Sequence, residues 1–246
     1  MIEDPLYSDP DLAQFYDLEN GWGDDFSYCE KLAKGVDSVL DLGCGTGELM
    51  AALAPKRAVG VDLAGAMLEI ARHRKGGALV DWVQADARTL DLGARFDLII
   101  LTSHAFQVFL TNEDQRAILK TIHRHLAPDG RFVFDTRNPA RKAWEGWTPA
   151  RTERRLPHPK LGEVRAWADA AYDETTQIAS IQTHYQPVGG DQGYAATSRI
   201  RFTSQPELAQ RITAAGLTVS SWLGSWQDHP FEPTAPQIIA IGQRAP

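Results

Sequence analysis

A hydrophobic segment near the start of the chain ends in three glycines separated by single residues. Residues 39–47 read Val-Leu-Asp-Leu-Gly-Cys-Gly-Thr-Gly. Glycine adopts backbone angles that other residues avoid, and its missing side chain lets backbone N–H groups approach a ligand closely. In open parallel sheets, nucleotides bind at the turn that follows the first strand. We therefore expect a nucleoside ligand here, with contacts from Asp41, Gly43, Cys44, Gly45 and Gly47.

Two phosphate-binding patterns are missing from this turn. Glu48 and Met50 stand where the two frames of the dinucleotide fingerprint Gly-x-Gly-x-x-Gly need a last glycine, and no Gly-Lys-Ser/Thr follows. Glu48 also falls in the first turn of the following helix, where its charge would repel a pyrophosphate. Carboxylates at this place suit a positively charged nucleoside better than a ligand that carries a pyrophosphate. A nicotinamide oxidoreductase and a tight turn without a ligand are the disfavoured alternatives.

The order of motifs over residues 38–136 resembles that of the class I S-adenosylmethionine-dependent methyltransferases, whose first motif is similar to the glycine segment. The resemblance implies S-adenosyl-L-methionine as cofactor. It implies that Asp62, with Leu63 beside it, accepts hydrogen bonds from the ribose hydroxyls, a task that suits a carboxylate with two oxygens. Asp86 and Ala87 match the positions that hold the adenine. The alternative roles are a helix N-cap for Asp62 and a surface carboxylate for Asp86.

The segment after the expected fourth strand reads Thr-Ser-His-Ala-Phe-Gln and begins at Thr102, which the resemblance places in the cofactor site. Methyl transfer from a sulfonium is an in-line displacement in which the protein mainly supplies alignment. A general base is needed only if the acceptor must lose a proton. His104 falls where donor and acceptor meet in such folds, and an imidazole titrates near neutral pH. It is the candidate base; the alternative is a histidine that only packs at a helix start.

A tyrosine-containing segment precedes the first strand. Comparable N-terminal segments of related small-molecule methyltransferases fold over the cofactor. By this resemblance Tyr16, and with less support Tyr7 or Tyr28, hydrogen-bonds the methionyl carboxylate. Alternatively, these tyrosines pack the N-terminal helices.

Short apolar runs alternate with helical patterns through the first half of the chain, which predicts a doubly wound α/β fold with a mostly parallel sheet. Strands are expected at 38–42, 58–62, 79–85, 96–102, 131–136, 217–223 and 237–241, and helices at 47–53, 64–73, 112–126 and 206–215. Residues 151–202 alternate with period two between Gly/Asp turns, which predicts an antiparallel β insertion after the fifth strand. The family resemblance implies a seven-stranded sheet of order 3-2-1-4-5-7-6.

Four regions follow from this reading: an N-terminal helical cap (1–37), a cofactor-binding core (38–140), a β insertion that covers the substrate (141–203) and a C-terminal helix with a β-hairpin (204–246). Trp144, Trp147 and Trp167 lie in or near the insertion. They either enclose a flat or cationic acceptor or form the core of the small sheet.

The overall charge limits the choice of partner. The chain of 246 residues carries a formal net charge of −7, whereas proteins that bind nucleic acid through phosphates are usually basic. No apolar stretch approaches the length of a membrane span, no targeting segment is recognisable, and the two cysteines make no disulfide framework. We expect a cytoplasmic enzyme without a metal or membrane partner, which methylates O or N of a small molecule; the oligomeric state stays open. A regulatory module that binds the cofactor without methyl transfer is the alternative.

Overall fold

The computed structural model describes residues 4–53 and 55–246, so residues 1–3 of the expected N-terminal cap lie outside the described part. Seven strands of the described chain form the main sheet. They are β1 (Ser38–Leu42), β2 (Arg57–Asp62), β3 (Asp81–Gln84), β4 (Phe96–Leu101), β5 (Leu126–Arg137), β10 (Leu217–Leu223) and β11 (Gln237–Arg244). Their order, β10-β11-β5-β4-β1-β2-β3, confirms the predicted topology. Strand β11 pairs antiparallel with both β10 and β5, and the other pairs of this sheet are parallel.

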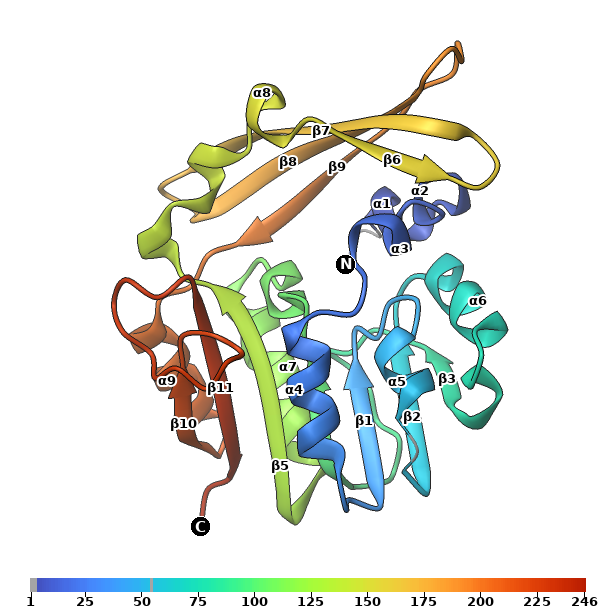
Figure 1. Ribbon diagram of the computed structural model, residues 1–246. Coiled ribbons are helices and arrows are strands. Elements are labelled where there is room, and N and C mark those ends of the chain that lie inside the picture. Colours follow the sequence, from blue (N-terminus) through green and yellow to red (C-terminus); the bar gives the residue numbers. More distant parts are fainter. Residues whose placement is uncertain (1–3, 54) are drawn as a thin grey trace.

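The centre of the main sheet is buried on both faces. Residues of β1 and β4 are almost all buried, as their runs of aliphatic side chains require in a sheet covered by helices. These helices are α4 (Asp24–Ala33), α5 (Glu48–Ala52), α6 (Gly65–His73), α7 (Asn112–His125) and α9 (Gln205–Ala214). Helix α7 buries Ile118, Leu119 and Ile122 on one face, and the side chain of Thr111 caps its N-terminus. Figure 1 shows that the carboxyl ends of the parallel strands lie together at one edge of the sheet.

The fifth strand begins earlier than the sequence predicts. We expected a helix over 112–126 and a strand from 131, but α7 ends at His125 and β5 starts at Leu126. Leu126 pairs with Phe96 of β4, and a register shift then brings Leu98 opposite Arg131. Residues 127–130, which were expected in neither element, join the strand through this irregular pairing.

A second sheet lies beyond the carboxyl ends of the parallel strands (Figure 1). It consists of β6 (Arg154–His158), β7 (Gly162–Asp173), β8 (Ile178–Pro187) and β9 (Tyr194–Arg201), all antiparallel, which confirms the predicted insertion. Short helical segments complete the fold. They are α1 (Pro5–Ser8), α2 (Pro10–Ala13), α3 (Tyr16–Glu19), α8 (Pro149–Thr152) and the 3₁₀ turns η1 (Gly77–Leu79), η2 (Ala105–Val108), η3 (Pro139–Arg141) and η4 (Ala143–Gly146).

Aromatic side chains pack the insertion and join it to the N-terminal segment. The ring of Trp144 stacks on Tyr172 with centroids 3.8 Å apart, and that of Trp167 stacks on His184 at 4.9 Å. Phe15, next to α3, stacks on Tyr185 of β8 at 4.1 Å. Trp144 and Trp167 are only partly buried and are not among the buried core residues of the second sheet. In the described ranges, no helix is long and apolar enough to cross a membrane.

Candidate active site

The glycine turn is held by backbone hydrogen bonds at the carboxyl end of β1. The N–H groups of Gly43 and Cys44 donate to the carbonyl oxygen of Val61 at 2.7 and 3.1 Å. Gly47 has a φ of 72°, and a Cβ atom there would lie 2.4 Å from the ring of Trp82. The turn therefore has room only for glycine at this position. It directs the chain from β1 into α5 with its backbone bare.

Two buried carboxylates flank this turn. The Asp62 carboxylate accepts hydrogen bonds from the N–H of Gly45 at 2.8 Å and from the N–H of Ala64 at 2.9 Å. Burial raises its pKa. Burial, with Asp62 and Asp25 nearby, also raises the pKa of Asp41 to about 8. Neither Asp41 nor Asp62 forms an ion pair with another described residue. Carboxylates held this way suit a cation better than a phosphate.

The N-terminal segment covers the turn. Tyr16 lies over Gly45, where its hydroxyl oxygen would be 3.6 Å from a Cβ atom. Next to it, the Asp17 carboxylate accepts a hydrogen bond from the Thr46 hydroxyl at 2.6 Å and pairs at 2.5 Å with Arg74, the residue that follows α6. A small hollow of about 20 Å³ remains under this cover. The hollow is lined by Tyr16, Asn20, Phe26, Asp41, Gly43, Cys44, Thr46, Glu48, Leu49, Thr102 and Ser103.

The predicted adenine contacts lie apart from that hollow, on the loop after β3. Asp86 is paired with Arg88 two residues on, with 2.5 Å between their nearest atoms. This pairing lowers the pKa of Asp86. Arg88 carries no role in the sequence prediction, although the spacing Asp-Ala-Arg contains the signal for it. The carbonyl oxygen of Leu63 accepts a hydrogen bond from Gln84 at 3.2 Å, which ties the ends of β2 and β3 together.

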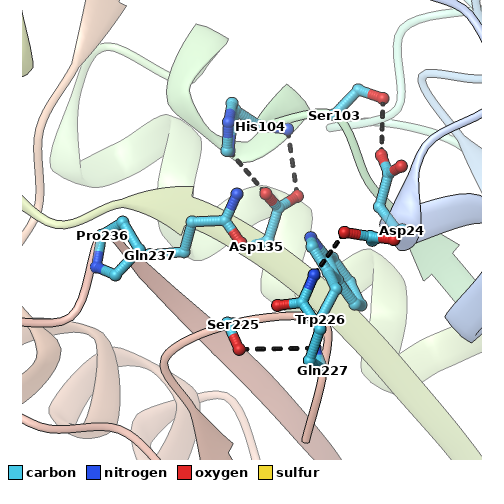
Figure 2. A pocket seen from close by; sticks show the side chains of 10 residues that line it. Asp24, Ser103, His104, Asp135, Ser225, Trp226, Gln227, Pro236 and Gln237 are labelled. Carbon is cyan, nitrogen blue, oxygen red and sulfur yellow. Dashed lines mark hydrogen bonds and ion pairs between the residues drawn. The ribbon is translucent and has the colours of Figure 1, made fainter. Parts of the chain in front are cut away.

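His104 occupies a constrained turn after β4. Its φ is 61° and that of Ser103 is 55°, both in the left-handed region that non-glycine residues seldom adopt. The Asp135 carboxylate of β5 accepts the backbone N–H of His104 at 3.0 Å, and its other oxygen lies 2.5 Å from the ring Nδ1 (Figure 2). Among the described residues Nδ1 makes no hydrogen bond of good geometry, so the short contact sets the ring beside the carboxylate without a linear hydrogen bond. Strained backbone of this kind concentrates at functional sites.

A cavity of about 330 Å³ opens beside His104 (Figure 2). Ser103 lines both this cavity and the hollow at the glycine turn, so the two spaces adjoin. The cavity is lined by Asp24, Asp25, Ser103, His104, Asp135, Ser225, Trp226, Gln227, Pro236 and Gln237. Sequence analysis does not predict its three carboxylates together, because Asp24 and Asp25 come from α4 and Asp135 comes from β5, far away in the sequence. The Ser103 hydroxyl donates to Asp25 at 3.2 Å, and burial raises the pKa of Asp25.

Cationic ligands suit this cavity, since Asp24, Asp25 and Asp135 face a space without a lysine or arginine among its lining residues. Buried Trp226 supplies an apolar wall. Within residues 4–53 and 55–246, no cluster of three His, Cys, Asp or Glu side chains is placed to hold a metal ion.

The order of the sheet and the glycine turn after β1 are typical of an α/β enzyme that binds a nucleoside cofactor, and the adjoining cavity offers space for a second substrate. Residues 39–130 match the family described as "Methyltransferase domain". The chain is 27% identical to the cypemycin N-terminal methyltransferase of a Streptomyces species over 84% of this chain and 83% of that protein. Residues 39–130 thus form a methyltransferase domain of the class I S-adenosylmethionine-dependent kind, and the methyl donor of the protein is S-adenosyl-L-methionine.

Solved structures share the complete fold. An S-adenosylmethionine-dependent methyltransferase from Clostridium acetobutylicum superposes with a TM-score of 0.77 at 17% identity, over 96% of this chain and 98% of that one. CalS10, an amino pentose methyltransferase from Micromonospora echinaspora, superposes with a TM-score of 0.72 at 22% identity, over 99% and 100% of the two chains. At these identities the likeness establishes the fold, including the insertion.

Proposed function

We propose that this protein transfers the methyl group of S-adenosylmethionine to an amine nitrogen of a small molecule. The observation that carries the proposal is the acid-lined cavity beside His104, which adjoins the hollow at the glycine turn. An amine is protonated near neutral pH, and a space lined by Asp24, Asp25 and Asp135 attracts it. An uncharged alcohol gains much less from these carboxylates.

The residues around the glycine turn fit the cofactor. When bound, S-adenosylmethionine supplies a methyl group already activated by its sulfonium charge. The Asp62 carboxylate offsets positive charge near the turn, and its oxygens have remaining lone pairs for the ribose hydroxyls. Asp41 is a proposed cofactor contact at the end of β1. Tyr16 lies where it can donate to the methionyl carboxylate. Gly43, Cys44, Gly45, Gly47, Leu63, Thr102, Asp86 and Ala87 complete the proposed cofactor contacts.

His104 is the proposed general base. The Asp135 carboxylate beside Nδ1 favours a proton on that nitrogen, which leaves the lone pair of Nε2 for the acceptor. The ammonium form of the acceptor gives a proton to His104. The free nitrogen then attacks the methyl carbon as the carbon–sulfur bond breaks, which leaves a methylated ammonium and S-adenosylhomocysteine. Asp135 is a positioning residue that orients the ring and stabilises its charged form.

Two relatives support an amine acceptor, because one is named as an N-terminal methyltransferase and the other as an amino pentose methyltransferase. A cavity of about 330 Å³ suits a small molecule or one end of a larger one. The net charge of −7 argues against nucleic acid. Cys29 and Cys44 are free thiols, which favours a reducing compartment such as the cytoplasm.

The test pairs amines with alcohols of the same carbon skeleton. Purified protein, S-adenosylmethionine and each compound are incubated, and release of S-adenosylhomocysteine is measured. We expect turnover with members of the amine set only. Turnover confined to the alcohols contradicts the proposal, and cofactor binding without turnover on any compound favours the regulatory alternative.

A variant pair localises the acceptor. Asp25→Asn removes a charge from the cavity and should raise the KM for the amine about tenfold, the effect of losing a charged partner, while the Kd for S-adenosylmethionine stays the same. Asp37→Asn, an exposed carboxylate paired with Lys56 away from the cavity, is the matched control and should leave both constants unchanged. If the two substitutions changed the KM for the amine equally, the acceptor would not bind in this cavity.

A further inference from the structure

The guanidinium of Arg88 forks onto the Asp86 carboxylate. Its Nε lies 3.0 Å from Oδ1 and 3.1 Å from Oδ2, and a terminal nitrogen lies 2.5 Å from Oδ2. The backbone N–H of Arg88 donates to Oδ1 at 2.9 Å. The other terminal nitrogen donates to Asp114 in the first turn of α7. All three nitrogens of the side chain are thus engaged by two carboxylates from two elements.

The loop that carries this pair is tied along one face of α7. Arg124 donates to the carbonyl oxygen of Leu90 at 2.7 Å, and the hydroxyl of Thr121 donates to the carbonyl oxygen of Arg88 at 3.3 Å. The N–H of Leu92 donates to Nε2 of His125 at 3.0 Å. Arg124 therefore anchors the same loop as Arg88 but makes no contact with Asp86. Substituting Arg124 therefore tests the anchoring of the loop, whereas substituting Arg88 also tests the contact with the carboxylate.

Asp86 still has room for another donor. About 22% of its side chain remains exposed, although both oxygens already accept from Arg88. An ionised carboxylate only accepts hydrogen bonds, whereas a protonated one also donates. An aspartate is ionised near neutral pH, so Asp86 can accept from an amino group but repels an oxo group at the same place. The contact with Arg88 adds direction, because it holds both oxygens in one orientation while part of the side chain stays exposed.

We propose that Arg88 is a positioning residue that orients the Asp86 carboxylate towards the purine of the cofactor and thereby makes the cofactor site prefer a 6-amino purine over a 6-oxo purine. The inference goes beyond the proposed acceptor chemistry. It rests on the assignment of Asp86 to the adenine amino group.

The experiment compares two ligands by calorimetry without any methyl acceptor. S-Adenosylhomocysteine carries the 6-amino group, and S-inosylhomocysteine carries a 6-oxo group in its place. We expect the wild-type protein to prefer the first ligand by at least about tenfold, the scale of one hydrogen bond to a charged group. Arg88→Met should narrow that preference to less than about threefold, and Arg124→Met should leave it at the wild-type value.

Further variants make each outcome decisive. Asp86→Asn should abolish the preference, because an amide can rotate to donate to the oxo group. A wild-type preference in Arg88→Met or in Asp86→Asn overturns the proposal, and so does an equal loss in Arg124→Met. If Arg88→Met does not fold, Arg88→Lys keeps the charge without the fork, and the proposal requires an intermediate preference there. Failure of the amine assay leaves these binding results unaffected.

Discussion

The ring Nδ1 of His104 lies 2.5 Å from one oxygen of Asp135, and the backbone N–H of the same histidine donates to the other oxygen at 3.0 Å. One carboxylate thus fixes both the turn and the ring. Without this carboxylate the left-handed backbone of the turn would lose a stabilising hydrogen bond, and the ring could rotate away from the cavity. Asp135 is only 1% exposed, so this contact lies beneath the cavity that we assign to the acceptor.

Replacing His104 by alanine should slow methyl transfer by about 10²–10⁴-fold, the usual contribution of a general base. The Kd for S-adenosylmethionine should stay within about twofold of wild type, because His104 lines the cavity that we assign to the acceptor. Turnover on an accepted amine and calorimetry measure the two quantities. His73→Ala, at an exposed histidine of α6, is the control. A wild-type rate for His104→Ala would dismiss the histidine as base.

Removing the Asp62 carboxylate should weaken cofactor binding by about 1–3 kcal/mol, the scale of lost hydrogen bonds to a charged acceptor. Asp62→Ala removes the proposed ribose contact and also frees the N–H of Gly45 that the carboxylate holds in the turn. Calorimetry with S-adenosylhomocysteine measures the change. Unchanged affinity would exclude Asp62 from the cofactor site.

Asp41 makes stability depend on pH. Its pKa is about 8 in the folded chain and near 3.8 in an ordinary environment, so folding takes up a proton between these values. The stabilisation by the neutral carboxyl group is complete below the unfolded pKa and is lost as the pH rises towards about 8. The free energy of unfolding of wild type should fall relative to that of Asp41→Asn by more than about 1.4 kcal/mol between pH 5 and 8. Parallel urea-unfolding profiles for both proteins would contradict this.

The ion pair of Asp17 with Arg74 should control how long the cofactor stays bound. Arg74 also donates to the carbonyl oxygen of Thr46 at 3.0 Å, so Arg74→Ala releases the N-terminal cover from the glycine turn. S-Adenosylhomocysteine should then dissociate about two- to fivefold faster in stopped-flow experiments, because the pair is partly exposed. Arg72→Ala removes an exposed pair with Glu69 on the same helix and should change nothing. Identical rates for all three proteins would rule out a role for this contact.

The elements of the main sheet could be predicted because their signals are local, whereas their order followed from the resemblance to the class I methyltransferases. The glycine turn, the run of aliphatic residues in β4 and the period-two pattern of the insertion each mark their own element. The start of β5 was misplaced because its first residues pair through an irregular register with Phe96, which no sequence pattern reveals.

The acceptor cavity could not be predicted, because its walls come from segments that no spacing rule connects. Asp25 lies in the first turn of α4, Asp135 near the end of β5, and Trp226 in the loop between β10 and β11. A partial signal existed for Asp135, since a carboxylate near the carboxyl end of a buried strand lies at the ligand-binding edge of such sheets. The pairing of Asp86 with Arg88 was within reach, because the two residues are almost adjacent.

The most direct measurement uses S-adenosylmethionine with a deuterated methyl group and mass spectrometry of an amine that the protein accepts. The account predicts that one deuterated methyl group appears on nitrogen, at a rate that falls at least about a hundredfold in His104→Ala. Label on oxygen of the acceptor, or label on nitrogen at the same rate without His104, would contradict it.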